Sequence, residues 1–200
     1  MPNSPRLLIL GSTSRYRREL LERLRLPFAV ESPKVDETPM QGEAPAALAV
    51  RLALAKAHAV AALHPEAVVI GSDQVADLDG QPIGKPGTHE RAVEQLTAMS
   101  GKQVVFQTAV AVVCRDSGFE GQSLAPVTVR FRKLSAAEIE TYLRAEQPYD
   151  CAGSAKSEGL GICLLSAIES DDPTALIGLP LIRTCALLRQ AGLDPLVARA

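Results

Sequence analysis

Apolar residues follow two different periods along this chain, and the period separates predicted strands from predicted helices. The run Leu7–Leu10 is continuously apolar, which is typical of a buried strand, and Gly11–Ser14 interrupts it. From residue 16 to residue 24 apolar side chains recur at helical spacing, with charged residues between them. The chain therefore begins with a predicted strand, tight turn and helix.

The next segment predicts a second strand and helix. A polar loop over 33–45 leads into an Ala/Leu-rich helix from about Pro45 to Leu63, where Pro45 suits the first helical turn. Ala67–Ile70 predicts a buried strand that ends at Gly71. The stretch 75–83 predicts a hairpin around the favoured turn pair Asp79-Gly80.

The second half continues the alternation. Thr88 caps a predicted helix that runs to Met99, and 104–114 predicts a long strand. Residues 127–131 alternate as a strand with one wet face, and Ser135 with Glu138 forms a capping box. The Gly-punctuated stretch 151–165 predicts strand, turn and strand, and 180–191 a final helix. We interpret the whole as α/β, a mixed sheet flanked by helices.

Composition narrows the class of protein. Two hundred residues suit one domain or one compact two-lobed unit over 1–200. A net charge of −2 does not favour a nucleic-acid polymer as partner, because phosphate-backbone binding needs a basic surface. The four cysteines show no Cys-x-x-Cys spacing, and no stretch approaches the ~18 apolar residues of a membrane span. We expect a cytoplasmic protein with free thiols and no membrane partner.

Two turns offer sites for phosphate or metal. Gly11–Arg18 is a small-residue turn that feeds a helix N-terminus, where backbone N–H groups, Ser12 and Arg17 favour an anion. An ordinary capped helix with a solvated basic face explains the same spacing. Glu37, in an acidic loop, can hold Mg²⁺ beside phosphates, although a solvated loop is the commoner case.

Asp73 is the strongest single candidate for chemistry. It follows an apolar run, at the expected C-terminal end of a strand, where sites form in open α/β sheets. A carboxylate there can bind metal or accept a proton from water, or it can simply begin a turn. Its neighbour Gln74 offers both a donor and an acceptor to a base edge.

Three further charged residues remain open from spacing alone. Lys56 lies among small apolar neighbours, so it either extends to solvent or points into a cleft. Lys85 follows the hairpin in the stiff segment Gly84–Pro86. Lys156 and Glu158 lie between glycines that suggest close backbone approach, with a plain Gly-rich turn as the alternative.

Taken in order, these motifs resemble the Maf family of nucleotide pyrophosphatases. The resemblance runs from Leu7 to about Pro195, and its motifs are 10–14 with 17–18, 35–37, 55–57, 71–73, 84–86, 152–154 and 178–180. Residues 70–75, 131–135 and 151–159 resemble the 7-methyl-GTP pyrophosphatase branch. The family usually has Ala at Gly11, Pro at Arg15 and Gly at Ala109.

The resemblance implies a fold, a reaction and a set of roles. It implies a Maf/ITPase-like twisted sheet with two lobes around a central cleft, dependence on Mg²⁺ or Mn²⁺, and homodimers. It implies Asp73 as proton acceptor. We expect the metal near Glu37 and Asp73, and we expect Ser12, Arg17, Lys56 and Lys85 to position the triphosphate and stabilise developing charge. Tyr16, Gln74 and Glu158 match the positions that set base preference.

On this basis we expect hydrolysis of 7-methyl-GTP to 7-methyl-GMP and diphosphate. Tyr16 can stack on the cationic methylated guanine, and Glu158 can accept from its N1–H and N2–H₂ edge. Two rival hypotheses remain, a dTTP/UTP or modified-pyrimidine pyrophosphatase of the same family and a nucleotide-binding regulator of cell division with little turnover. Whether Asp73 is base, metal ligand or both also stays open.

Overall fold

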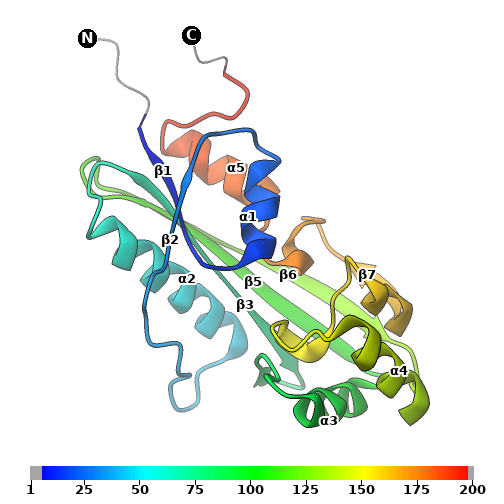
Figure 1. The fold of residues 1–200 in the computed structure, drawn as a ribbon. Coiled ribbons are helices and arrows are strands. Elements are labelled where there is room, and N and C mark those ends of the chain that lie inside the picture. The colour runs from blue at the N-terminus through cyan, green and yellow to red at the C-terminus, as the bar shows by residue number, and fades with distance from the viewer. Residues whose placement is uncertain (1–5, 198–200) are drawn as a thin grey trace.

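One mixed sheet organises the molecule. The structure, a computed structural model, describes residues 6–197, and its seven strands follow the order β2-β1-β3-β5-β6-β7, with β4 paired to β3 (Figure 1). The strands are β1 Leu8–Gly11, β2 Ala29–Glu31, β3 Val68–Leu78, β4 Gln81–Ile83, β5 Gln103–Cys114, β6 Phe119–Phe131 and β7 Leu165–Glu169. The predicted mixed α/β sheet is confirmed.

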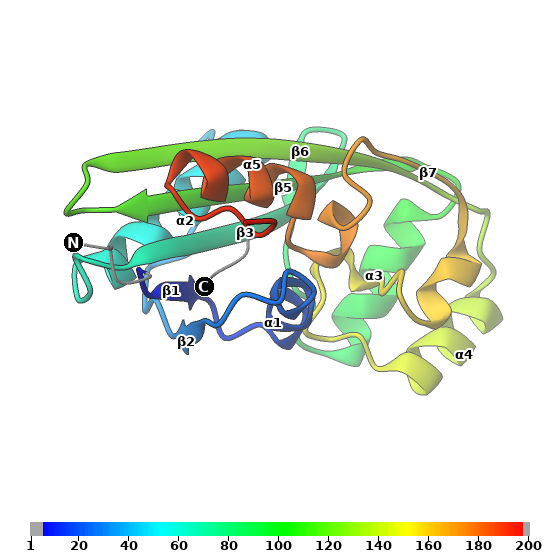
Figure 2. The same cartoon turned by 90° about the horizontal axis from the view of Figure 1, so that it is seen from above.

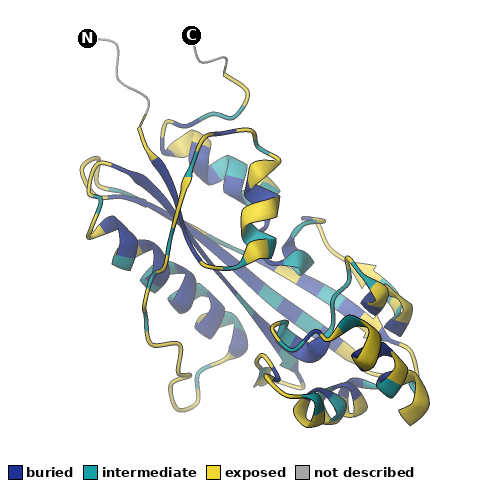
Figure 3. Cartoon of the chain, viewed as in Figure 1, coloured by how far each residue is buried: buried dark blue, intermediate teal, exposed yellow. Residues whose placement is uncertain are grey.

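Five α-helices cover this sheet in the described part of the chain. They are α1 Arg15–Glu22, α2 Pro45–Ala61, α3 His89–Met99, α4 Ala136–Glu146 and α5 Leu181–Gln190. Helix α2 packs on one face; on the opposite face α1 and α5 cover one end, and α3 and α4 the other (Figure 2). The central strands β1, β3 and β5 are largely buried between these layers, while the outer helix faces are exposed (Figure 3). Within 6–197, no helix has both the length and the apolar character that crossing a membrane requires.

The strand that contains Asp73 is longer than the sequence predicted. We expected it to end at Gly71, but β3 continues to Leu78 without a break. The reason is its partner: β5 pairs antiparallel with β3 from Val69 to Asp77, so the backbone through Ser72 and Gln74 remains in the sheet. Asp73 therefore lies in mid-strand, and the prediction that it lies at a strand end was wrong.

The sheet nevertheless has an open edge at this position. The parallel neighbour β1 pairs with β3 only as far as Ile70, and β4 pairs with it only from Ala76 onward. Between these two partners the described chain offers no strand to the β3 edge. Antiparallel continuation of β3 past the end of β1 thus creates the gap where a site can form.

The predicted strand–turn–strand over 151–165 was also wrong. The chain forms two short 3₁₀ helices there, Ala152–Ser154 and Leu160–Leu164, and a strand begins only at Leu165. Gly153 and Ser154 have φ values of 65° and 55°, in the left-handed region that an extended strand excludes. Glycine spacing alone did not reveal this, and the three-residue edge strand β2 was missed as well.

The remaining local signals are confirmed. Asp79 and Gly80 both adopt positive φ, as a tight β3–β4 turn requires. Thr88 caps α3, and Ser135 and Glu138 make the reciprocal capping box of α4. The Ala/Leu-rich segment forms α2 with Pro45 in its first turn. These elements hold the loops that surround the open edge of β3.

Candidate active site

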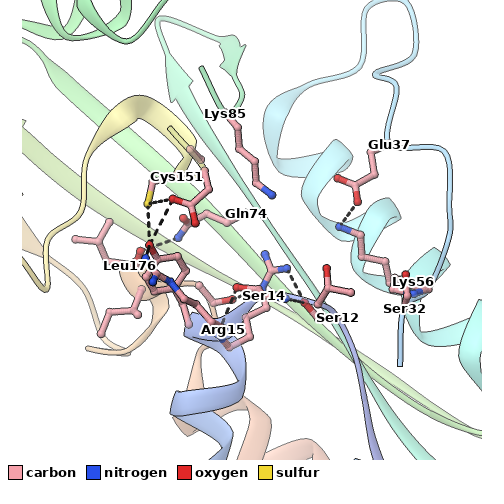
Figure 4. Close-up of a pocket in the computed structure, with 18 of the residues that line it drawn as sticks. Ser12, Ser14, Arg15, Ser32, Glu37, Lys56, Gln74, Lys85, Cys151 and Leu176 are labelled. Carbon is pink, nitrogen blue, oxygen red and sulfur yellow. Dashed lines mark hydrogen bonds and ion pairs between the residues drawn. The ribbon is translucent and has the colours of Figure 1, made fainter. Parts of the chain in front are cut away.

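A cleft of about 490 Å³ lies at the open edge of β3 (Figure 4). Its walls come from the turn after β1, the start of α1, the 32–37 loop, α2, the loop after β4, and the segments 150–158 and 176–178. Every sequence-predicted site residue except Asp73 lines it. They are Ser12, Tyr16, Arg17, Glu37, Lys56, Gln74, Lys85 and Glu158.

The turn after β1 is built to bind an anion. Ser12 is only 4% exposed, and its Oγ accepts from the Ser14 N–H at 3.2 Å and from Arg17 Nη1 at 3.4 Å. Because both contacts use Ser12 as acceptor, its hydroxyl hydrogen remains to donate into the cleft. Ser14 caps α1, so the free N–H groups of the first helical turn face the same region.

Arg17 is held in place by the opposite wall. Its Nε donates to the Gly178 carbonyl at 2.9 Å, which ties α1 to the loop before α5. Burial lowers the pKa of Arg17, whereas Asp73 and Glu37 oppose that shift. A guanidinium keeps its proton in proteins, so Arg17 presents a fixed positive charge whose remaining N–H groups can fork onto a phosphate.

Lys56 links the two carboxylates that the sequence singled out. Its Nζ lies 2.6 Å from Asp73 Oδ1 and 2.9 Å from Glu37 Oε1, and Lys56 itself is 4% exposed. Helix α2 reaches β3 this closely because of Gly71, where an added Cβ would lie 2.2 Å from the Ala53 carbonyl oxygen. Lys56 therefore points into the cleft and not to solvent.

Lys56 separates Asp73 from the cleft. Asp73 is 6% exposed and is absent from the described residues that line the cavity. Burial opposes ionisation of Glu37, but Lys56, Lys85 and Arg17 together hold the pKa of Glu37 below its usual range. The Lys85 amine extends toward the same space (Figure 4). We call Ser12, Arg17, Lys56 and Lys85 the cationic end of the cleft.

Gln74 lies on the other face of β3 from Asp73, because side chains alternate along a strand. Its Nε2 donates to Thr108 Oγ1 at 2.9 Å and to the carbonyls of Ala175 and Leu176 at 2.9 and 3.0 Å. Two carbonyl partners fix the amide orientation, since a flipped amide would oppose oxygen to oxygen. The donor half is thus committed to the protein, and Oε1 is what Gln74 offers the cleft as an acceptor.

Tyr16 already contacts a cation. The guanidinium of Arg15 lies 4.7 Å from the centre of its ring, and Arg15 Nη2 donates to the hydroxyl at 2.7 Å. The hydroxyl lies 3.4 Å from Asp150 Oδ1, and burial raises the pKa of Tyr16 to about 12, so the ring stays neutral. One face of Tyr16 is therefore covered by Arg15 in this structure.

Glu158 adds a carboxylate to the part of the cleft wall that the 150–158 segment forms. It is exposed and lines the cleft, and within the described chain its side chain makes no ion pair. We call Tyr16, Gln74, Asp150 and Glu158 the acceptor end. Lys156, weighed with Glu158 from the sequence, does not belong to the cleft: its Nζ is paired with Glu146 Oε1 at 2.6 Å.

The donor set for a divalent metal is small. Glu37 and Asp73 are the two carboxylates within reach, and no cluster of three or more metal-ligating side chains occurs in 6–197. Mg²⁺ is commonly held by one or two carboxylates together with substrate phosphates and water. The residues present fit a metal of that kind, provided that Lys56 yields its contacts with both carboxylates.

Two charged residues that line the cleft were not singled out from the sequence. Lys34, from the 32–37 loop, and Asp150, beside Cys151, both line the cleft. Lys34 has a φ of 45°, unusual for a residue other than glycine, which the sequence does not announce. Asp150 follows a proline-bearing turn that looks like an ordinary loop.

Comparison with known proteins identifies the family of this chain. A family model described as "Maf-like protein" matches residues 7–191. The chain belongs to the Maf family. Three Maf relatives carry the name "7-methyl-GTP pyrophosphatase". The one from Polaromonas sp. is 73% identical, over 94% of this chain and 85% of its own length.

The other two relatives cover nearly all of both chains. The protein from Albidiferax ferrireducens is 67% identical over 96% of this chain and 97% of its own. The protein from Bordetella pertussis is 62% identical over 98% of each. The resemblance seen in the sequence is therefore confirmed at the level of the family, and most of the Maf motifs that suggested it converge on one cleft.

Proposed function

We propose that this protein is a nucleoside triphosphate pyrophosphatase that hydrolyses 7-methyl-GTP to 7-methyl-GMP and diphosphate. The observation that carries the proposal is the polarity of the cleft, with cations at one end, of which Lys56 is buried, and hydrogen-bond acceptors at the other. A triphosphate suits the first, and a cationic base with N–H donors suits the second. The names of the three relatives favour the same substrate.

The cationic end has the chemistry to bind and polarise the triphosphate. Ser12 and the α1 N-terminus offer neutral donors, and Arg17 offers a fixed fork. Lys56 and Lys85 add two mobile charges that can follow negative charge as it moves onto the departing diphosphate. Phosphoryl transfer depends mostly on such positioning and electrostatic stabilisation.

Asp73 is proposed as the group that accepts the proton of the attacking water. The anhydride between the α- and β-phosphates breaks, diphosphate leaves, and the water proton passes to the Asp73 carboxylate. Lys56 Nζ, 2.6 Å from Asp73, must first turn toward the phosphates to open access. Binding of the triphosphate supplies the alternative anionic partners for that movement, so substrate itself would expose the base.

A divalent cation, Mg²⁺ or Mn²⁺, is part of the proposal. Glu37 and Asp73 would hold it, and when bound it would neutralise charge on the triphosphate. The two carboxylates lie close to one point, because the Lys56 ammonium group is 2.6 Å from Asp73 and 2.9 Å from Glu37. A metal-bound carboxylate is a weaker base. Asp73 can therefore be both metal ligand and proton acceptor only if one of its two oxygens does not bind the metal.

The acceptor end favours the methylated guanine over a pyrimidine. Gln74 Oε1 and Glu158 can both accept from the N1–H and N2–H₂ groups, and carboxylates nearby offset the positive charge of the base. The Tyr16 ring attracts a cation, as its contact with Arg15 illustrates. A pyrimidine base is neutral and smaller than methylated guanine, so it gains less from each contact.

One assay separates the proposal from its rivals. Diphosphate release from 7-methyl-GTP, GTP, dTTP and UTP, with Mg²⁺ or Mn²⁺, is expected to be fastest with 7-methyl-GTP. A preference for dTTP or UTP would indicate the pyrimidine enzyme, and tight binding without release would indicate a regulator. We further propose a cytoplasmic homodimer, on the family resemblance, and light scattering of the purified protein tests the dimer.

A further inference from the structure

Glu158 lies on a loop that does not fix the direction of its side chain by direct contact. Within residues 6–197, the Glu158 side chain accepts one long hydrogen bond, of 3.5 Å, from the hydroxyl of its neighbour Ser157. The aim of Glu158 into the cleft therefore depends on the backbone of the 156–160 loop. A residue outside the 156–160 loop must hold the loop backbone, because the side chain of an exposed glutamate on an unsupported loop would adopt many orientations.

Glu146, the last residue of α4, holds both ends of this loop. Its Oε1 accepts from Lys156 Nζ at 2.6 Å, and its Oε2 accepts from the Leu160 N–H at 2.8 Å. The loop closes between these contacts with a Gly159 N–H to Lys156 carbonyl bond of 3.1 Å. One carboxylate thus spans the turn that presents Glu158.

The loop is shaped around that carboxylate. A Cβ on Gly159 would lie 2.6 Å from Glu146 Oε2, so a larger residue there would displace the carboxylate from its present position. The side chains of Lys156 and Glu146 are 22% and 15% exposed, which makes their ion pair less screened than a surface pair. Lys156 and the Leu160 N–H hold the pKa of Glu146 below its usual range, so this carboxylate is charged at neutral pH.

From these contacts we propose that Glu146 is a positioning residue that sets base preference by holding Glu158 toward the base. The inference rests on the proposed function, because it concerns the same substrate. Glu146 does not line the cleft, so it acts through the loop and touches no substrate. Lys156 contributes to the same positioning, because its ammonium group pairs with the Glu146 carboxylate and offsets its charge. Glu158 then remains the carboxylate that is available to the base.

The test compares kcat and KM for 7-methyl-GTP and GTP in the full-length protein. Glu146→Gln keeps an acceptor for the Leu160 N–H but loses the charge, and Lys156→Met removes the partner while keeping the stem. We expect the preference for 7-methyl-GTP to fall about tenfold in Glu146→Gln and less in Lys156→Met, with kcat little changed. Glu169→Gln removes an exposed ion pair between β7 and Arg130 of β6; it is the matched control and should leave the preference unchanged.

The outcomes separate this inference from the proposed function. A wild type with no preference for 7-methyl-GTP would overturn the proposed function. A wild-type preference that survives in both folded variants would overturn the role of Glu146. Equal losses on both substrates, with a lowered melting temperature, would mean general stabilisation and would also overturn it. If Glu146→Gln does not fold, the preference measured in Lys156→Met decides the role of Glu146. That variant removes only one of the two contacts that Glu146 makes with the loop.

Discussion

The two ends of the cleft are built in different ways. At the cationic end, Ser12 and Lys56 are 4% exposed and Asp73 is 6% exposed, and their contacts pass through the sheet and α2. At the acceptor end, Glu158 is exposed on a loop, and the Tyr16 ring is covered by the exposed side chain of Arg15. Much of the cationic end is thus part of the protein core, whereas the acceptor end, apart from Gln74 on β3, is assembled from less buried segments around it.

This difference suggests a division of labour. Charges in a partly buried site act more strongly on a phosphate than charges in water, so the cationic end is suited to the step common to every triphosphate. Exposed side chains on loops can change with little cost to folding, so the acceptor end is suited to choosing the base. Substitutions at the two ends should therefore differ in which kinetic parameter they change.

The largest effect is expected from Asp73→Asn. Removing the proposed proton acceptor should lower kcat by about 10³-fold on every substrate, the usual range for general-base catalysis. Diphosphate release from 7-methyl-GTP and GTP measures it. Asp77→Asn, on the same strand but outside the cleft lining, is the matched control. Unchanged turnover in Asp73→Asn would remove Asp73 from the mechanism.

Lys56→Met should reduce stability as well as activity. It leaves Asp73 buried without its 2.6 Å partner, and breaking a buried ion pair in this way costs about 3 kcal/mol. Urea unfolding measures the loss. The double variant Lys56→Met/Asp73→Asn should recover most of the stability but none of the turnover; a double variant as unstable as the single one would contradict the pairing.

Arg17→Lys should weaken the binding of all triphosphates alike. Lysine cannot donate to Gly178 and fork onto a phosphate at once, so KM should rise about tenfold with each substrate tested. Arg18→Lys is a close control, because Arg18 is exposed and pairs with Glu22. A KM that changes for 7-methyl-GTP alone would assign Arg17 to the acceptor end.

Tyr16→Leu should give the smallest change and only with the cationic base. The preference for 7-methyl-GTP over GTP should fall about threefold, within the range of a cation–π contact. Tyr16→Phe keeps the ring while losing the hydroxyl contacts with Arg15 and Asp150, so it should keep the preference. An equal loss in both variants would assign the effect to the hydroxyl.

The sequence predicted the cationic end better than the acceptor end, for a physical reason. Ser12 and Arg17 belong to one short segment, the turn and first helical turn of α1. Its small residues and capping residue predict an anion site from local sequence alone. The environment of Gln74 depends on carbonyls about a hundred positions away, so its committed donor half had no local signal. Glu146 is likewise one of many helix glutamates until the fold brings the loop against it.

The difference between local and long-range contacts also explains which fold predictions were wrong. Elements set by their own residues, such as the capping box of α4 and the Asp79-Gly80 turn, were predicted correctly. Continuation of β3 through Asp73 depends on pairing with β5, which no short window of sequence contains. The 3₁₀ helices near Gly153 depend on left-handed backbone that glycine permits but does not require.

The most direct test of the division between the two ends is the kcat/KM ratio for 7-methyl-GTP over GTP in Glu158→Gln, measured beside Asp73→Asn. Glu158→Gln keeps the size of the side chain and removes its charge. We predict that Glu158→Gln lowers the ratio about tenfold at nearly constant kcat, while Asp73→Asn slows both substrates equally and leaves the ratio unchanged. An unchanged ratio in Glu158→Gln, or one that falls in Asp73→Asn, would contradict the account.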